Sequence, residues 1–359
     1  MGGGFRNCDC GRAGQDRLMR RLFCIATIMG LATATAAEVP LTRIAFGSCC
    51  HQDKPKPILN AVLATKPEVF LFLGDNIYGD TEDMAVMREK YRRLDADAGF
   101  AALRARSTIL GVWDDHDYGV NDGGAEYPMR EASQREFAAF FRLPPESPVH
   151  RRPGIYDARR FGPEGRVVQI ISLDTRYFRS PLVKHPQYDP RGPYTVNRDP
   201  AATVLGAAQW TWLAERLREP ADLRVVMSSY QLLPQDHGWE CWENIPAERA
   251  RFLQLLKETS ATNVIVLSGD RHMGEIMKLA ATDPLSPGAP VWEITSSGLT
   301  NGGGGKVDEP NRHRVSPRTY RDLNFGLLEI DWEKREVEGS LRRLDGEAVF
   351  RVKIGLERR

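Results

Sequence analysis

The sequence predicts an α/β protein in which strands and helices alternate along most of the chain. Short runs of β-branched and aromatic residues recur, and several are almost continuously apolar, as expected of strands buried on both faces. Between them lie segments whose apolar residues are spaced three and four apart, which is typical of amphipathic helices. This alternation favours a layered α/β domain over an all-helical or all-strand fold.

The elements follow in order along the chain. The predicted strands cover residues 43–46, 69–73, 108–112, 167–173, 224–228, 264–267 and 291–295. The predicted helices cover residues 57–64, 84–94, 130–141, 206–217 and 247–257. The C-terminal part differs, because its strands follow one another directly at residues 326–331, 336–344 and 348–354. An Asp345-Gly346 turn predicts that they form an antiparallel meander.

Composition excludes several classes of protein. The 359 residues are 42% hydrophobic and 27% charged, which is ordinary for a globular protein and excludes disordered and fibrous chains. A formal net charge of +1 gives no electrostatic case for a nucleic-acid partner. No internal repeat or linker-like tract divides residues 37–359, so we expect a single domain there.

Residues 1–36 have the pattern of a signal peptide. An arginine-rich start precedes an apolar stretch at residues 22–34, and Ala34-Thr35-Ala36 offers a cleavage site. The stretch is too short and too rich in Ala, Thr and Gly for a stable membrane span, although a retained anchor is an alternative. We therefore expect a periplasmic or secreted protein.

The export route has more than one interpretation. Arg20-Arg21-Leu22-Phe23 is similar to a twin-arginine signal, which exports folded proteins, and ordinary secretion is the alternative. A start at Met19 would leave a short conventional signal. After cleavage only Cys49, Cys50 and Cys241 remain, and three cysteines cannot all pair, so a metal-bound thiolate is a reasonable role for one of them.

Polar and metal-binding residue types follow the predicted strands. In α/β sheets, ligands bind beyond the carboxyl ends of the strands. Carboxylates gathered at one rim raise one another's pKa unless cations neutralise them, so hard metal ions are expected there. The segments concerned are GSCCH at 47–51, GDNIYGD at 74–80, WDDHD at 113–117, LDTR at 173–176, SSYQ at 228–231 and SGDRH at 268–272.

Each residue also has a structural interpretation when taken alone. Asp75 could cap a turn, Cys49 could be a small buried residue, and Tyr78 could simply pack. We interpret Asp114 and Asp117 as residues that cap or hydrogen-bond neighbouring loops. The joint pattern at successive strand ends is what favours a metal site.

At these segments the chain resembles the PhoD-type alkaline phosphatases of the calcineurin-like metallophosphoesterase superfamily. The resemblance spans residues 42–331 and is specific because the segments occur together, with WDDHDYGVND extending to residue 122. It implies a four-layer α-β-β-α sandwich with a metal centre at the strand ends. It also implies hydrolysis of phosphate monoesters by a metal-bound hydroxide. Classical members carry an N-terminal β-domain, and since GSC follows the signal region at once, we expect a short form without it.

The resemblance assigns the first metal site to a mixed set of ligands. Cys49 matches a thiolate on Fe³⁺, Asp75 a carboxylate that bridges two metals, and Tyr78 a phenolate ligand. His272 completes this site. Cys50 lies outside the match, and we interpret it as structural.

The second site is richer in oxygen. Asp115 stands where the superfamily usually has Asn, and Asp270 replaces a histidine, so the resemblance implies Ca²⁺, Mg²⁺ or Mn²⁺ there. A further superfamily histidine, expected near residues 229–231, is absent. His116 is expected near the leaving group, and Asn121 and Arg176 are assigned to phosphate or second-site contacts.

Three functions remain open at this point. Phosphomonoester hydrolysis leads, with small-molecule, lipid-derived or nucleotide-derived phosphate esters as the substrate class. A phosphodiesterase on the same dinuclear site is the close alternative. The third is a non-catalytic metal-binding or phosphate-binding relative, against which the retained His116 argues.

Overall fold

The computed structural model describes Met1, residues 39–302 and residues 308–358. Apart from Met1, the expected signal peptide lies outside the described residues, so the boundary at residues 36 and 37 stays a prediction. None of the helices among the described residues is long and apolar enough to cross a membrane.

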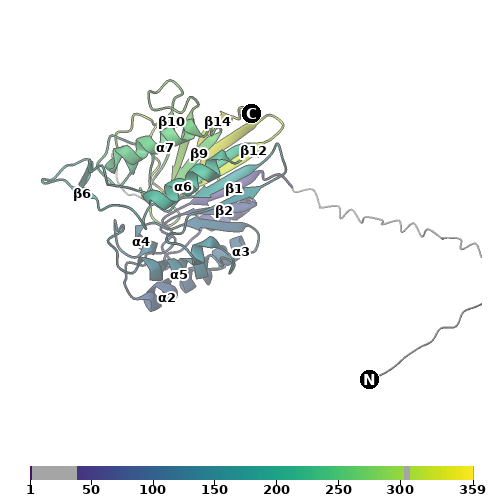
Figure 1. Cartoon of the computed structure of the whole chain (residues 1–359). Coiled ribbons are helices and arrows are strands. Elements are labelled where there is room, and N and C mark those ends of the chain that lie inside the picture. Colours follow the sequence, from purple (N-terminus) through teal and green to yellow (C-terminus); the bar gives the residue numbers. More distant parts are fainter. Residues whose placement is uncertain (2–38, 303–307, 359) are drawn as a thin grey trace, which may run out of the picture. The chain divides into compact units, whose positions relative to one another are not determined.

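Among the described residues the chain forms two six-stranded sheets and a small two-stranded hairpin (Figure 1). The first sheet has the order β14-β13-β12-β1-β2-β3. Its parallel half consists of β1 (Arg43–Gly47), β2 (Val69–Leu73) and β3 (Thr108–Val112). The predicted C-terminal meander is confirmed as its antiparallel half, which consists of β12 (Asn324–Asp331), β13 (Glu336–Arg343) and β14 (Ala348–Gly355).

The second sheet has a parallel centre and antiparallel edges, in the order β10-β11-β9-β8-β5-β4. The centre is formed by β5 (Val168–Ser172), β8 (Leu223–Met227), β9 (Val264–Ser268) and β11 (Val291–Ser296). The edges are β4 (Asp157–Phe161) and β10 (Gly274–Leu279). The hairpin pairs β6 (Val183–Lys184) with β7 (Tyr194–Thr195).

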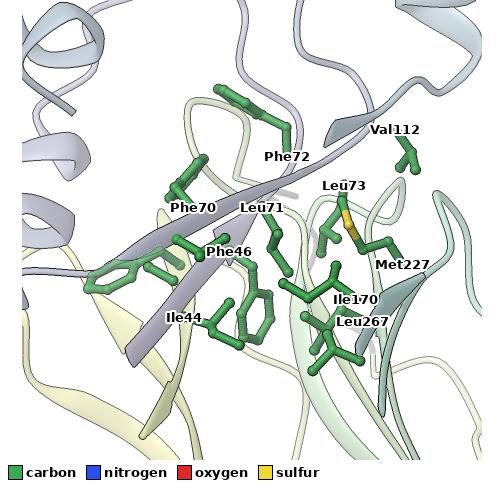
Figure 2. Packing of buried hydrophobic residues seen from close by; sticks show 14 of the residues in the cluster. Ile44, Phe46, Phe70, Leu71, Phe72, Leu73, Val112, Ile170, Met227 and Leu267 are labelled. Carbon is green, nitrogen blue, oxygen red and sulfur yellow. The ribbon is translucent and has the colours of Figure 1, made fainter. Parts of the chain in front are cut away.

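The core between the two sheets explains why the central strands are apolar throughout. Side chains alternate along a strand, and Figure 2 shows Leu71 and Leu73 of β2 close to Met227 and Leu267 of the second sheet. Every residue of β2 is buried. A strand covered on both faces needs apolar side chains at every position, and this is the pattern read from the sequence.

Helices cover the outer faces of both sheets. Phe72 points away from the sheet interface, and its ring lies 5.5 Å from Phe100 and 6.4 Å from Phe141. This outer layer contains α1 (Ile58–Ala64), α2 (Met84–Asp95), α3 (Ala98–Arg104) and α5 (Arg130–Phe140), with the short α4 (Asp115–Tyr118). On the second sheet, Val226 shares a core with Trp210 and Phe252. Those residues lie on α6 (Gly206–Arg218) and α7 (Pro246–Glu258).

The expected four-layer α-β-β-α sandwich is thereby confirmed, and the predicted elements agree with the structure to within a few residues at each end. The prediction missed β4, β10, α3, α4 and the hairpin. The edge strand β4 has the sequence DARRF, whose polar residues hide the strand pattern, and α4 is only 4 residues long. The strands that carry the polar segments belong to both sheets, so their carboxyl ends meet across the sandwich.

Candidate metal centre

The backbone at the strand ends is strained at several of the predicted metal ligands. Non-glycine residues seldom have a positive φ, and each such residue costs on the order of 1–3 kcal/mol. Such strain gathers at functional sites because the surrounding structure must hold it. The residues concerned are Cys49 (φ 59°), Asp75 (φ 50°), Asp270 (φ 67°) and His272 (φ 50°).

The first group of ligands, which we call the thiolate side, consists of Cys49, Tyr78 and His272. Cys49 Sγ lies 3.2 Å from Asp75 Oδ2 and 3.0 Å from Ser297 Oγ. Ligand atoms of Cys49, Asp75 and His272 all lie within 4.8 Å of one another. The Tyr78 hydroxyl lies 3.0 Å from His272 Nε2. The structure therefore brings together the residues that the resemblance assigns to the first site.

Burial keeps the thiolate side uncharged. It raises the pKa of Cys49 to about 11, although hydrogen bonds from Ser297 and Ser48 oppose the shift. Burial, together with the neighbouring thiol and Asp75, also raises the pKa of Tyr78 well above its usual range. Burial and the charge of Arg271 lower the pKa of His272 to about 4, so its imidazole is neutral and able to bind a metal. A cation would have to displace the protons of the thiol and the phenol.

The second group, which we call the carboxylate side, consists of Asp114, Asp115, Asp122, Glu240 and Asp270. It is larger than the sequence predicted. Ligand atoms of Asp114, Asp115 and Asp270 lie within 4.8 Å of one another, and the same holds for Asp115, Asp122 and Glu240. Asp115 also groups with Asp75 and His116, and this links the carboxylate side to the thiolate side.

A buried arginine offsets part of this negative charge. Arg176 is fully buried, and its Nε donates to Asp114 Oδ1 at 2.7 Å. Its two Nη atoms donate to the Glu240 carboxylate at 2.8 and 2.6 Å, and Arg179 Nε lies 3.2 Å from the same group. The resemblance assigns Arg176 to phosphate or second-site contacts. The structure places its guanidinium inside an ion-pair network with carboxylates of the second site, where its donors are engaged by the protein itself.

The carboxyl groups in and around this network differ in the direction of their pKa shifts. Burial raises the pKa of Asp75 and of Asp270 well above the usual range, and it raises that of Asp114 to about 6 despite the opposing charge of Arg176. Burial also acts on Asp115, yet the charges of Arg176 and His116 prevail and lower its pKa. Asp115 is therefore the member of this set whose charged form the network favours.

Two carboxylate oxygens in these groups of potential ligands have no hydrogen-bond partner among the described residues. They are Asp75 Oδ1 and Asp114 Oδ2, and both are buried. Buried carboxylate oxygens are costly to leave unpaired, because their hydration is lost without replacement. Both belong to the groups of potential ligands described above, so this donor set fits bound cations.

His116 lies where the two sides meet. Its Nδ1 is 2.7 Å from Asp80 Oδ1, its backbone N–H donates to Asp115 Oδ1, and its ring packs on that of Tyr78 at 4.1 Å. Burial would lower its pKa, but the hydrogen bond to Asp80 and the charges of Asp115 and Asp80 raise it to about 9. His116 is therefore a cationic donor whose Nδ1 is already engaged.

Asn121 contacts one of these groups through its neighbour Asp122. Asn121 is exposed, and its amide donates to Asp122 Oδ2 at 2.9 Å. Its assignment to a phosphate or second-site contact stays a prediction. Asp122 itself belongs to the group with Asp115 and Glu240, and it also accepts a hydrogen bond from the Tyr194 hydroxyl of β7. Asp122 belongs to the WDDHDYGVND segment and could have been considered, whereas no sequence signal marks Glu240.

The residues interpreted as structural have the expected roles, with one addition. Asp117 Oδ1 accepts the backbone N–H groups of Asp75 and Asp114, and Cys50 lies in the main apolar core. Ser229, in the segment that lacks the superfamily histidine, donates to Asp114 Oδ1 at 2.6 Å. Asp114 thus bonds neighbouring loops as expected, and it also faces the carboxylate side.

Comparison with known proteins agrees with this geometry. A family model described as PhoD-like phosphatase matches residues 44–341. Alkaline phosphatase D of Bacillus subtilis (strain 168) is 24% identical over 312 residues, which cover 76% of this chain. The matched region is 53% of that relative, so the chain spans about half the length of the curated protein that it matches.

Solved structures share the fold at low sequence identity. A structure of PhoD superposes with a TM-score of 0.65 at 19% identity, covering 89% of this chain and 69% of that one. A dimetal phosphatase from Danio rerio superposes with a TM-score of 0.52 at 13% identity, covering 89% of this chain and 100% of that one. Since the family model covers most of the chain, this protein belongs to the PhoD-like phosphatase family.

Proposed function

We propose that this protein hydrolyses phosphate monoesters. In this reaction the ester P–O bond breaks, the oxygen of water forms the new P–O bond, and the departing oxygen takes up a proton. The observation that carries the proposal is the pair of buried, unpartnered oxygens Asp75 Oδ1 and Asp114 Oδ2 beside His116, whose Nδ1 lies 2.7 Å from Asp80 Oδ1. Membership of the PhoD-like phosphatase family supports it.

The donor chemistry of the two sides favours different cations. Cys49, Tyr78, His272 and Asp75 would hold Fe³⁺, because thiolate, phenolate and imidazole suit a transition metal. Asp75, Asp115 and Asp270, with Asp114 and Asp122 nearby, would hold Ca²⁺, Mg²⁺ or Mn²⁺ through oxygen. When bound, such cations neutralise phosphoryl oxygens and lower the pKa of water.

The chain itself supplies the proton for the leaving group. Asp80 holds His116 through Nδ1, so Nε2 is the atom from which a proton reaches the departing ester oxygen. The raised pKa of His116, about 9, keeps that proton in place at neutral pH. The same positive charge would attract the dianionic phosphoryl group of a monoester.

Arg176 acts indirectly in this proposal. It holds Asp114 and Glu240 in fixed positions beside Asp115, so the carboxylate side keeps its geometry without mutual repulsion forcing its members apart. We assign it a positioning role rather than a phosphate contact, because its donors are already engaged.

One experiment separates the open functions. Protein purified without added metal is analysed for metal content and assayed with p-nitrophenyl phosphate and bis-p-nitrophenyl phosphate. We expect iron plus a second cation and a higher kcat/KM on the monoester. A preference for the diester would establish the phosphodiesterase alternative. Metal-loaded protein that hydrolyses neither ester would establish the non-catalytic one.

We also propose export to the periplasm or the medium, on the pattern of residues 1–36 alone. Replacement of Arg20 and Arg21 by lysine is expected to block a twin-arginine route and leave metal-loaded precursor in the cytoplasm. Ordinary secretion tolerates lysine at these positions, so unchanged export of the double variant would exclude the twin-arginine route.

A further inference from the structure

An exposed indole stands beside the carboxylate side. Trp239 is 41% exposed, although both of its neighbours in the chain are buried. Gly238 donates its backbone N–H to Arg191 O at 2.9 Å and accepts that of Tyr194 at 2.8 Å, which ties it to the β6–β7 hairpin. On the other side, Glu240 is held by the ion pairs described above. Trp239 is therefore held in place by its backbone while its ring faces solvent.

A second contact joins this ring to Arg271, the residue next to the proposed ligand Asp270. The Arg271 guanidinium carbon lies 4.9 Å from the centre of the Trp239 ring, and its Nη1 lies 3.8 Å from Asp270 Oδ2. Nη2 donates to Glu309 at 2.8 Å, which holds the guanidinium in this position. Arg271 is mostly buried, with 11% of its side chain exposed. The indole is thus linked to the metal centre in two ways, because Glu240 is its neighbour in the chain and Arg271, on which its ring packs, lies next to Asp270.

We propose that Trp239 determines specificity by stacking against a planar ring in the leaving group of the substrate. This inference rests on the proposed hydrolysis, and it names the substrate class as phosphate monoesters of nucleosides or of aryl alcohols. A cation that packs on an aromatic ring fixes the orientation of that ring, and Arg271 does this here. An aromatic ring that is fixed yet exposed offers a stacking surface of the kind on which proteins hold bases without reading their identity.

The test compares two alkyl phosphates with the same type of leaving group, adenosine 5′-monophosphate and ribose 5-phosphate. Only the first carries a planar ring. For Trp239→Ala we expect the KM of the nucleotide to rise about ten-fold, within the range of one base stacked on an aromatic side chain. The KM of ribose 5-phosphate and both kcat values should stay unchanged. Trp239→Phe keeps a ring and should restore most of the affinity.

A matched control comes from another exposed aromatic residue. Tyr188 is 92% exposed in the β6–β7 hairpin, and Tyr188→Ala should leave both KM values unchanged. Phenyl phosphate distinguishes a preference for nucleobases from a preference for any planar ring. If Trp239→Ala raises the KM of phenyl phosphate as much as that of the nucleotide, the stacking surface accepts any planar leaving group. If it raises the KM of the nucleotide more, the surface prefers a nucleobase.

The inference is separable from the proposed reaction. Adenosine cannot be hydrolysed, so its binding to the metal-loaded protein by calorimetry does not depend on turnover. Adenosine binding that Trp239→Ala weakens while Tyr188→Ala does not would support the stacking surface even in a protein without phosphatase activity. Equal KM values for the two substrates in the wild type, or equal changes in both on mutation, would overturn the inference and leave the phosphatase proposal standing.

Discussion

The thiolate side and the carboxylate side handle buried charge in opposite ways. On the thiolate side, burial keeps the groups neutral, because the Cys49 thiol and the Tyr78 phenol hold their protons and His272 gives its proton up. On the carboxylate side, a buried cation is supplied by the chain, since Arg176 pairs with Asp114 and Glu240. The groups of the thiolate side are thus neutral before a metal binds, whereas the carboxylates of the carboxylate side are already positioned by ion pairs with Arg176.

This difference has a consequence for metal loading. Binding at the thiolate side must release protons, so its affinity should rise with pH. The carboxylate side already contains a carboxylate in its charged form, because Arg176 and His116 lower the pKa of Asp115. Asp75 lies within reach of ligands on both sides, so its substitution should have the most severe effect.

Asp75→Asn should impair metal binding at both sides. Asparagine removes the charge shared by both sets of ligands, while the left-handed backbone at this position tolerates the change well. We expect kcat to fall by more than about 10⁴-fold, beyond the loss expected for a general acid. Metal analysis should show both cations depleted. Retention of either metal at full occupancy would contradict the bridging role.

His116→Ala should lower kcat while leaving both sides able to bind metal. We expect a loss of about 10²–10⁴-fold on alkyl phosphates, the usual range for a general acid. The loss should be smaller on aryl phosphates, whose leaving groups need less help from a proton. Asp80→Asn is the positioning counterpart, with a smaller loss of the same substrate dependence. Equal losses on both classes of ester would indicate that His116 positions metals instead.

Arg176→Met should destabilise the apoprotein, because Asp114 and Glu240 would be left buried without their counter-charge. Breaking a buried ion pair from one side costs about 3–5 kcal/mol. Urea denaturation in EDTA measures this loss, and added Ca²⁺ should restore part of it by neutralising the same carboxylates.

A surface arginine provides the control for Arg176. Arg92 pairs with Glu89 in an exposed helical position, and Arg92→Met should leave the free energy of unfolding almost unchanged. If Arg176→Met were as mild as Arg92→Met, or if Ca²⁺ gave no recovery, the carboxylate side would not depend on its internal cation.

Tyr78→Phe tests the thiolate side by spectroscopy. If the Tyr78 phenolate and the Cys49 thiolate bind Fe³⁺, the pure protein should show a visible charge-transfer band, and the Phe variant should shift or weaken it. Tyr156, which is buried away from these groups, serves as the control in Tyr156→Phe. An active, colourless protein without iron would exclude the ferric assignment.

Much of the metal centre could be predicted because its residues follow strands directly. A strand with apolar side chains on both faces is recognisable locally, and a polar residue just after it must lie at the rim of the sheet. Cys49, Asp75, Asp115 and Asp270 were placed in this way, aided by the family resemblance. The same reasoning named Asn121 and missed its neighbour Asp122, because the order of residues in a loop does not tell which side chain faces the cluster.

The elements, their layering and the residue types gathered at one rim follow from the chain alone, because periodicity and strand-end residues are local properties. The balance of charge at that rim depends on the folded arrangement. Arg176 reaches Asp114 and Glu240 across separations of 62 and 64 residues, and Glu240 stands in a loop without any recognisable pattern. Such pairs depend on how two sheets pack and where loops cross, and no segment of the chain carries that information alone.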